Sequence, residues 1–131
     1  MNGTISEWLK KAEGDYLTAG REFSVATDQN FDAVCFHSQQ AIEKMMKAAI
    51  IQAGGLAPKI HDLVELNTRL KAVRADWDWQ VQELRLLSRA AVDFRYPGES
   101  ADANIAKLAY QIAGKIRKGL LKLFPDSANP V

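Results

Sequence analysis

The clearest helix in this sequence is centred on Phe36-His37-Ser38-Gln39-Gln40-Ala41-Ile42-Glu43-Lys44. Apolar side chains recur around this run at helical spacing, so one helix face is apolar from Phe31 to about Ala53. The pair Gly54-Gly55 then favours a left-handed C-terminal cap. Glu43 and Lys47 lie four residues apart in the favourable order, and we expect this pair on a solvated face of the helix.

Four further helices follow from the same spacing rule, and no alternating strand pattern competes with them. The expected helices cover about 4–23, 31–53, 62–73, 81–94 and 101–122. In the last three we expect the apolar residues, including Val73, Val81 and Leu108, to face inward. Short connections favour antiparallel neighbours, so the predicted fold is all-α, a five-helix up-and-down bundle.

Bulk properties indicate a single domain. A chain of 131 residues can bury one core, which we place at about 4–124, with a tail at 125–131. The formal net charge of +1 argues against a protein that grips nucleic acid through overall charge. The single cysteine, Cys35, together with the lack of a leader or a membrane-length apolar run, predicts a cytoplasmic protein without a membrane span.

Two more runs belong with the first: Pro58-Lys59-Ile60-His61-Asp62-Leu63 and Phe94-Arg95-Tyr96-Pro97. In their order and spacing the three runs resemble the prokaryotic HEPN family of small helical proteins, over about Ile5 to Leu123. The family includes RNA-cutting toxins whose signature is an Arg followed four to six residues later by His. The resemblance implies that Arg95 would act at a cleft between two subunits.

No histidine follows Arg95, so we assign no catalytic residue and lean against an enzyme. If the protein were nevertheless a nuclease, His37 or His61 would have to supply the acid or base. Otherwise we expect His37 to be partly buried and hydrogen-bonded to a neighbouring helix. We expect His61 and Asp62 to satisfy backbone groups at a helix start. With two histidines and no cysteine cluster, we expect no metal site.

Two surface features could contact a nucleotide or RNA. Arg85, Arg89 and the Arg95 region could form one basic patch beside Tyr96, although solvated charges explain such residues more often. Trp77 and Trp79 could stack on bases or close the end of the bundle.

The resemblance implies a HEPN-like binding module that partners a minimal nucleotidyltransferase in a toxin–antitoxin or nucleotide-handling system. Two alternatives stay open: a metal-independent RNA endonuclease with a degenerate motif, and a structural dimerisation domain. We expect a homodimer formed through the fourth helix, the Arg95 turn and the start of the last helix. A nucleotide or RNA ligand is possible. No cofactor is expected, since no nucleotide-binding glycine loop is present.

Overall fold

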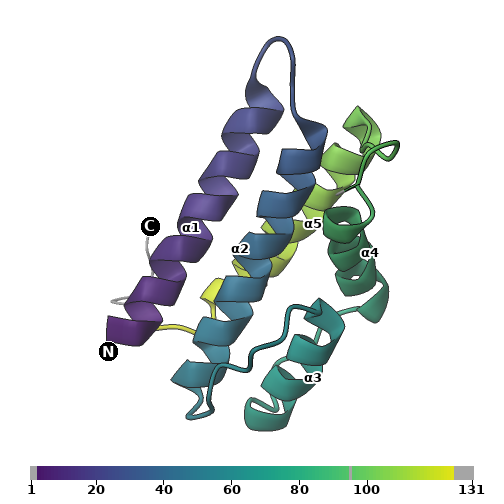
Figure 1. The fold of residues 1–131 in the computed structure, drawn as a ribbon. Helices are drawn as coiled ribbons and strands as arrows, with labels where there is room; N and C mark the ends of the chain where they lie inside the picture. The colour runs from purple at the N-terminus through teal and green to yellow at the C-terminus, as the bar shows by residue number, and fades with distance from the viewer. Residues whose placement is uncertain (1–2, 95, 126–131) are drawn as a thin grey trace.

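The computed structural model describes residues 3–94 and 96–125, and within these ranges it contains five α-helices and no strand. The helices are α1 (Gly3–Ser24), α2 (Phe31–Gln52), α3 (Leu63–Val73), α4 (Val81–Val92) and α5 (Ala103–Leu121). Figure 1 shows α1 and α2 as a long antiparallel hairpin, with α3 and α4 on the opposite side of α2 from α1. The all-α bundle is therefore confirmed.

Helix α2 is the central element, because it contacts each of the other four helices. A helix surrounded in this way must be apolar on almost all sides. Over its second half nearly every residue is buried, and the fully buried Ile42 and Met46 pack into the one core cluster described. The other helices contribute their own buried residues, chiefly Leu9, Leu66, Leu70, Leu84, Leu87, Ile116 and Leu120.

Capping side chains set the helix starts. Asn30, Asp62 and Asp102 accept hydrogen bonds from the backbone N–H groups three residues on, at 3.0, 3.3 and 2.8 Å. Because Asp102 is the cap, α5 begins at Ala103, not at residue 101 as expected. Helix α4 is also shorter than expected, since it ends at Val92.

The connection after α2 turns back along that helix. Gly54 has φ +95°, and the N–H groups of Gly54 and Gly55 donate to the carbonyls of Ile51 and Ile50, both at 2.9 Å. This pairing is a Schellman cap, which confirms the predicted left-handed ending. By residue 61 the chain again lies beside the middle of α2, where Gln39 donates to the His61 carbonyl at 3.1 Å.

The two tryptophans close the bundle. Trp77 is buried, stacks on Trp79 with centroids 5.6 Å apart, and donates from its indole to Asn67 at 2.8 Å. A Cβ at Gly119 of α5 would lie 3.0 Å from Trp79 and 3.4 Å from Trp77, so glycine permits this close approach. Of the two roles considered for these rings, the structure therefore supports the closing of the bundle.

Three residues expected to face inward do not. Val73 and Val81 are 44 % and 39 % exposed, because they are the last residue of α3 and the first of α4. Leu108 is 44 % exposed in the middle of α5. A leucine exposed within α5, away from the helix ends, indicates that the other four helices leave this part of α5 uncovered.

Some predictions fall outside the described residues. These are the placement of Arg95 and of all but the first residue of the 125–131 tail. Within the described part of the chain, no helix is long and apolar enough to cross a membrane. The same part contains no group of three or more His, Cys, Asp or Glu side chains that could hold a metal ion.

Candidate functional site

Two hollows lie on either side of α4, and they share no residue. The first, here called the central pocket, has a volume of about 420 Å³ and lies between α2, the segment before α3, and α4. It is lined by Phe36, Gln39, Gln40, Glu43, His61, Asp62, Ser88, Ala91 and Val92. The second, here called the α4–α5 groove, is of similar volume, about 430 Å³. Its lining is Gln82, Arg85, Leu86, Arg89, Ala90, Asp93, Phe94, Ile105 and Leu108.

The central pocket is built on a buried carboxylate, that of Glu43 on α2. One of its oxygens, Oε1, accepts hydrogen bonds from the amides of Gln39 and Gln40 at 3.1 and 3.4 Å. The other, Oε2, accepts from Lys47 Nζ at 3.1 Å and faces His61 Nδ1 at 2.9 Å. A buried carboxylate is tolerated only when its lone pairs are met in this way.

The exposed position predicted for Glu43 and Lys47 is wrong. Their side chains are only 5 % and 6 % exposed. The Lys47 ammonium also lies 5.6 Å from the centroid of the Trp8 ring of α1, in cation–π geometry. The pair is therefore buried because α1 and the linker cover the helix face that carries it.

His61 joins the buried carboxylate to solvent. Its side chain is 82 % exposed, yet Nδ1 lies against the Glu43 carboxylate. In the neutral ring, only the tautomer with a proton on Nδ1 can donate to that oxygen, which leaves the Nε2 lone pair free. A carboxylate that fixes one ring nitrogen in this way orients the other for proton transfer or for accepting a hydrogen bond. The expectation for Asp62 is met, because Asp62 caps α3.

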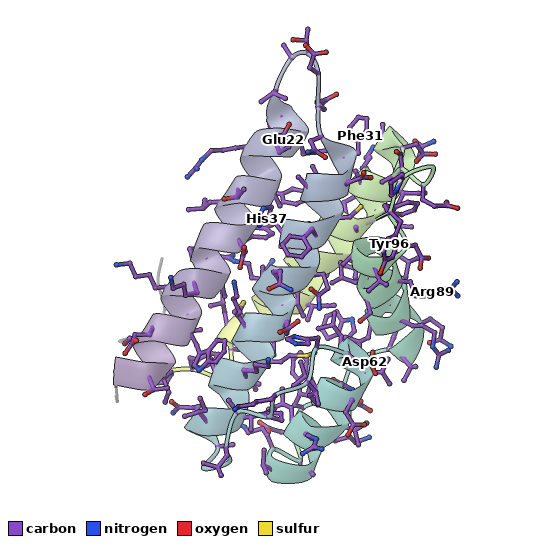
Figure 2. The ribbon with its side chains drawn as sticks, viewed as in Figure 1. Glu22, Phe31, His37, Asp62, Arg89 and Tyr96 are labelled. Atoms are coloured by element: carbon purple, nitrogen blue, oxygen red, sulfur yellow. The ribbon has the colours of Figure 1, made fainter. Side chains whose placement is uncertain are left out.

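His37 lies on the other side of α2 from this pocket. Its Nδ1 is 2.8 Å from the Asp15 carboxylate of α1, and Asp15 also binds Lys44. Figure 2 shows His37 facing α1, well away from Arg89 and Tyr96 on the α4 side. This matches the expectation of a partly buried histidine that ties two helices together. Of the two histidines, only His61 shares a pocket with α4.

The predicted basic patch is only partly assembled. Arg85 and Arg89 both line the α4–α5 groove, where Arg89 lies 3.6 Å from Asp93. Within residues 3–94 and 96–125, Arg85 forms no ion pair or hydrogen bond through its guanidinium. Tyr96 is 68 % exposed and lies outside the groove lining. Arg95, between Phe94 and Tyr96, is outside the described residues.

Two of the basic residues late in α5, Lys115 and Arg117, are paired with carboxylates on other helices. Arg117 pairs with Glu13 at 2.6 Å, and its guanidinium lies 4.7 Å from the centroid of the Tyr16 ring. Lys115 binds Glu83 of α4, and this hydrogen bond is the main reason that the pKa of the Glu83 carboxyl is lowered. These cations hold helices together, which leaves fewer of them to attract phosphates.

Cys35 offers no reactive thiol. It is fully buried in the core, and burial is the main cause that raises its pKa to about 11. The nearby Asp32 and Asp102 carboxylates raise it further. Because the thiolate is the reactive form, this cysteine is inert at neutral pH.

The Glu43 network generates a stability prediction. Glu43→Ala leaves the Lys47 ammonium buried without its partner, so we expect the free energy of unfolding to fall by about 3–5 kcal/mol. The double variant Glu43→Leu with Lys47→Met removes both charges, and we expect it to regain about half of that loss or more. Urea unfolding measures both values.

The matched control is Glu65→Ala on α3. Glu65 also precedes its basic partner, Arg69, by four residues, but both side chains are about half exposed. We expect this variant to change the free energy of unfolding by less than about 0.5 kcal/mol. If Glu43→Ala were as mild as Glu65→Ala, the buried network would contribute little to stability.

Comparison with known proteins agrees with this architecture. The family model of the HEPN domain matches residues 5–123. The crystal structure of TT1696 from Thermus thermophilus is similar, with a TM-score of 0.76 and 21 % sequence identity. That similarity covers 94 % of this chain and all of the other, and at this identity it concerns the fold alone. No curated protein matches the chain significantly. Since the family match spans nearly the whole helical bundle, the chain belongs to the HEPN domain family.

Proposed function

We propose that this protein is a cytoplasmic, single-domain HEPN binding module that forms a homodimer through the α4–α5 groove. The observation that carries the proposal is the apolar floor of that groove, which includes Ile105 and the 44 % exposed Leu108. Contiguous exposed apolar surface on a folded protein commonly marks an interaction site. The predicted dimer contact, through the fourth helix and the start of the last, coincides with this surface.

The charges on the rim favour a second copy of the chain as the occupant. A two-fold interface brings the same patch of both subunits together, so the patch must complement itself. The rim carries two cations, Arg85 and Arg89, and one anion, Asp93. A two-fold axis across the groove can therefore set the Arg85 of one subunit against the Asp93 of the other.

We further propose that the dimer partners a nucleotidyltransferase-type protein, in a toxin–antitoxin or nucleotide-handling system. Its support is the family membership, together with the small net charge of +1. Tight binding to nucleic acid through phosphates requires several clustered cations. In the described part of the chain, Arg117, Lys115 and Lys44 are already paired with carboxylates.

A second candidate function is metal-independent RNA cleavage. The Glu43–His61 pair supports it, because this pair could supply the acid or base that the sequence lacks after Arg95. His61 shares the central pocket with Val92, three residues before Arg95 along the chain. General acid–base catalysis needs a positioned proton donor or acceptor within hydrogen-bond reach of the reacting group, and an imidazole oriented by a carboxylate can serve. We still prefer the binding module, because the motif position after Arg95 holds no histidine.

The dimer proposal predicts the behaviour of Leu108→Asp. A charge in the groove must be desolvated on association, so we expect this variant to be monomeric while the wild type is dimeric at high micromolar concentration. Light scattering after gel filtration measures the mass. Leu17→Asp is the matched control, since Leu17 is a 47 % exposed helical leucine on α1 outside the groove. A monomeric wild type would contradict the proposal.

The partner proposal predicts a ranking of affinities. We expect the protein to bind the nucleotidyltransferase-type protein encoded beside it more tightly than it binds single-stranded RNA. Calorimetry with both ligands at two salt concentrations tests this, because phosphate binding weakens steeply with salt. Tight, salt-sensitive RNA binding without binding to the protein partner would reverse the ranking.

The cleavage assay separates the two candidate functions. We expect the pure protein to show no substantial metal-independent cleavage of single-stranded RNA. No histidine follows Arg95, and loss of acid–base help forfeits roughly a hundredfold to ten-thousandfold in rate. Robust cleavage that Arg95→Ala and His61→Ala both abolish, but His37→Ala does not, would instead establish the nuclease.

A further inference from the structure

The connection between α4 and α5 contains a defined turn at residues 96–99. The Glu99 N–H donates to the Tyr96 carbonyl at 3.3 Å, and Gly98 has φ +91°. Because the ring of Pro97 fixes its own φ at about −65°, a positive φ at the next residue identifies a type II turn. Proline and glycine occupy the two positions that favour this turn, so the sequence itself presets its backbone.

One side chain from a distant helix ties this turn to the bundle. The Asp32 carboxylate, in the first turn of α2, accepts a hydrogen bond from the Ala101 N–H at 2.7 Å. Ala101 is itself buried, and the residue after it, Asp102, caps α5. Within residues 3–94 and 96–125, no other side chain hydrogen-bonds to the 96–101 segment. Asp32 therefore sets where the turn lies relative to α2.

The turn presents Tyr96 to solvent beside the α4–α5 groove. Its side chain is 68 % exposed, and Figure 2 shows it on the same side of the molecule as Arg89. It follows by two residues Phe94, which lines the groove. An aromatic side chain on a preset backbone loses little conformational freedom on binding, and tyrosine is enriched among the residues that dominate interface affinity. These features point to contact with another molecule.

The α4 side of the groove identifies where that contact falls in a dimer. Its residues repeat every three or four positions and so form one stripe along the helix: Gln82, Arg85, Leu86, Arg89 and Asp93. An antiparallel pair of stripes, with the two-fold axis near Arg89, sets Arg85 against the partner's Asp93. Tyr96 lies three residues after Asp93, and Gln82 lies three residues before Arg85. The same alignment therefore carries Tyr96 to the partner's Gln82.

The charges of the stripe favour an aromatic ring at that place. Each stripe has two cations and one anion, and Asp93 already lies 3.6 Å from Arg89 of its own helix. Two stripes together thus carry an excess of cations. The face of an aromatic ring attracts a guanidinium, so a Tyr96 ring beside the partner's Arg85 offsets this excess.

We propose that Tyr96 of each subunit packs into the Gln82 end of its partner's α4–α5 groove, and that Asp32 is the positioning residue for this contact. The inference rests on the proposed dimer and names a residue that each copy contributes to the other. A dimer whose affinity does not depend on Tyr96 would overturn the inference alone, whereas a monomeric wild type would contradict the dimer as well.

The dissociation constant of the dimer, measured by analytical ultracentrifugation of the full chain, tests the role of Tyr96. We expect Tyr96→Ala to weaken the dimer by at least about tenfold. Tyr96→Phe keeps the ring, and we expect a loss of less than about threefold. Leu56→Ala is the control, because Leu56 is a 91 % exposed apolar residue on the connection between α2 and α3. Equal effects of Tyr96→Ala and Leu56→Ala would count against the contact.

Two variants of Asp32 test its positioning role. Asp32→Ala removes the acceptor, so we expect the Ala101 amide to exchange at least about tenfold faster and the dimer to weaken. Asp32→Asn retains an oxygen that accepts the same hydrogen bond, and we expect it to restore both values. Glu65→Ala is the control, since Glu65 is also an acidic residue in the first turn of its helix. An Asp32→Ala dimer as tight as the Glu65→Ala dimer would exclude the positioning role.

Disulfide trapping tests the contact directly, since a disulfide requires Cβ atoms about 3.5–4.5 Å apart. The native Cys35 is fully buried and does not interfere. We expect a mixture of Tyr96→Cys and Gln82→Cys subunits to form a linked dimer on mild oxidation. Each mixed dimer retains one unaltered Tyr96 contact. A mixture of Tyr96→Cys and Leu17→Cys should stay unlinked. Equal linking in the two mixtures, or faster linking of Tyr96→Cys to itself, would overturn the proposal.

Discussion

The carboxylate of Glu43, buried in the middle of α2, is the constraint on which the rest of the structure depends. It gathers donors from its own helix, through Gln39, Gln40 and Lys47, and from the distant His61. Burying an ion pair is costly in water-free surroundings and often adds little stability over apolar residues of similar size. Its specific contribution is geometric, because it holds the returning linker at one height along α2.

That placement decides what α4 can do. With the linker fixed beside α2, α3 starts at Asp62, and its first N–H, that of Leu63, meets Ser88 of α4. One side of α4 then faces the central pocket, and its other side faces α5 across the apolar groove. One helix therefore separates the central pocket from the α4–α5 groove.

The helices themselves were predictable, because their signals are local. Asn30 lies in the stretch that offers caps for α2, and Gly54 marks the left-handed ending. The burial of Glu43 and Lys47 was not predictable, since a pair spaced four residues apart reads the same on an exposed helix. Only the packing of α1 and the linker over that face distinguishes the two cases. One signal in the sequence did indicate burial, because most of the residues around Glu43 and Lys47 between Ala41 and Ile50 are apolar.

The site was foreseeable only in part for the same reason. His37 and His61 look equivalent as isolated histidines, yet one meets Asp15, 22 residues before it, and the other meets Glu43, 18 residues before it. No local pattern encodes such distant partners. The Arg85 and Arg89 positions follow from helical spacing, whereas the groove between them and Leu108 depends on how α4 rests against α5.

The most direct test of the account is the tautomer of His61, read from the ¹⁵N shifts of its ring by NMR in the neutral state. If the Glu43 carboxylate organises the pocket, the proton resides on Nδ1 and Nε2 is unprotonated. In Glu43→Gln this preference should weaken, because the amide can also donate to the ring. A proton on Nε2 in the wild-type protein, unchanged by Glu43→Gln, would contradict the central role of the carboxylate.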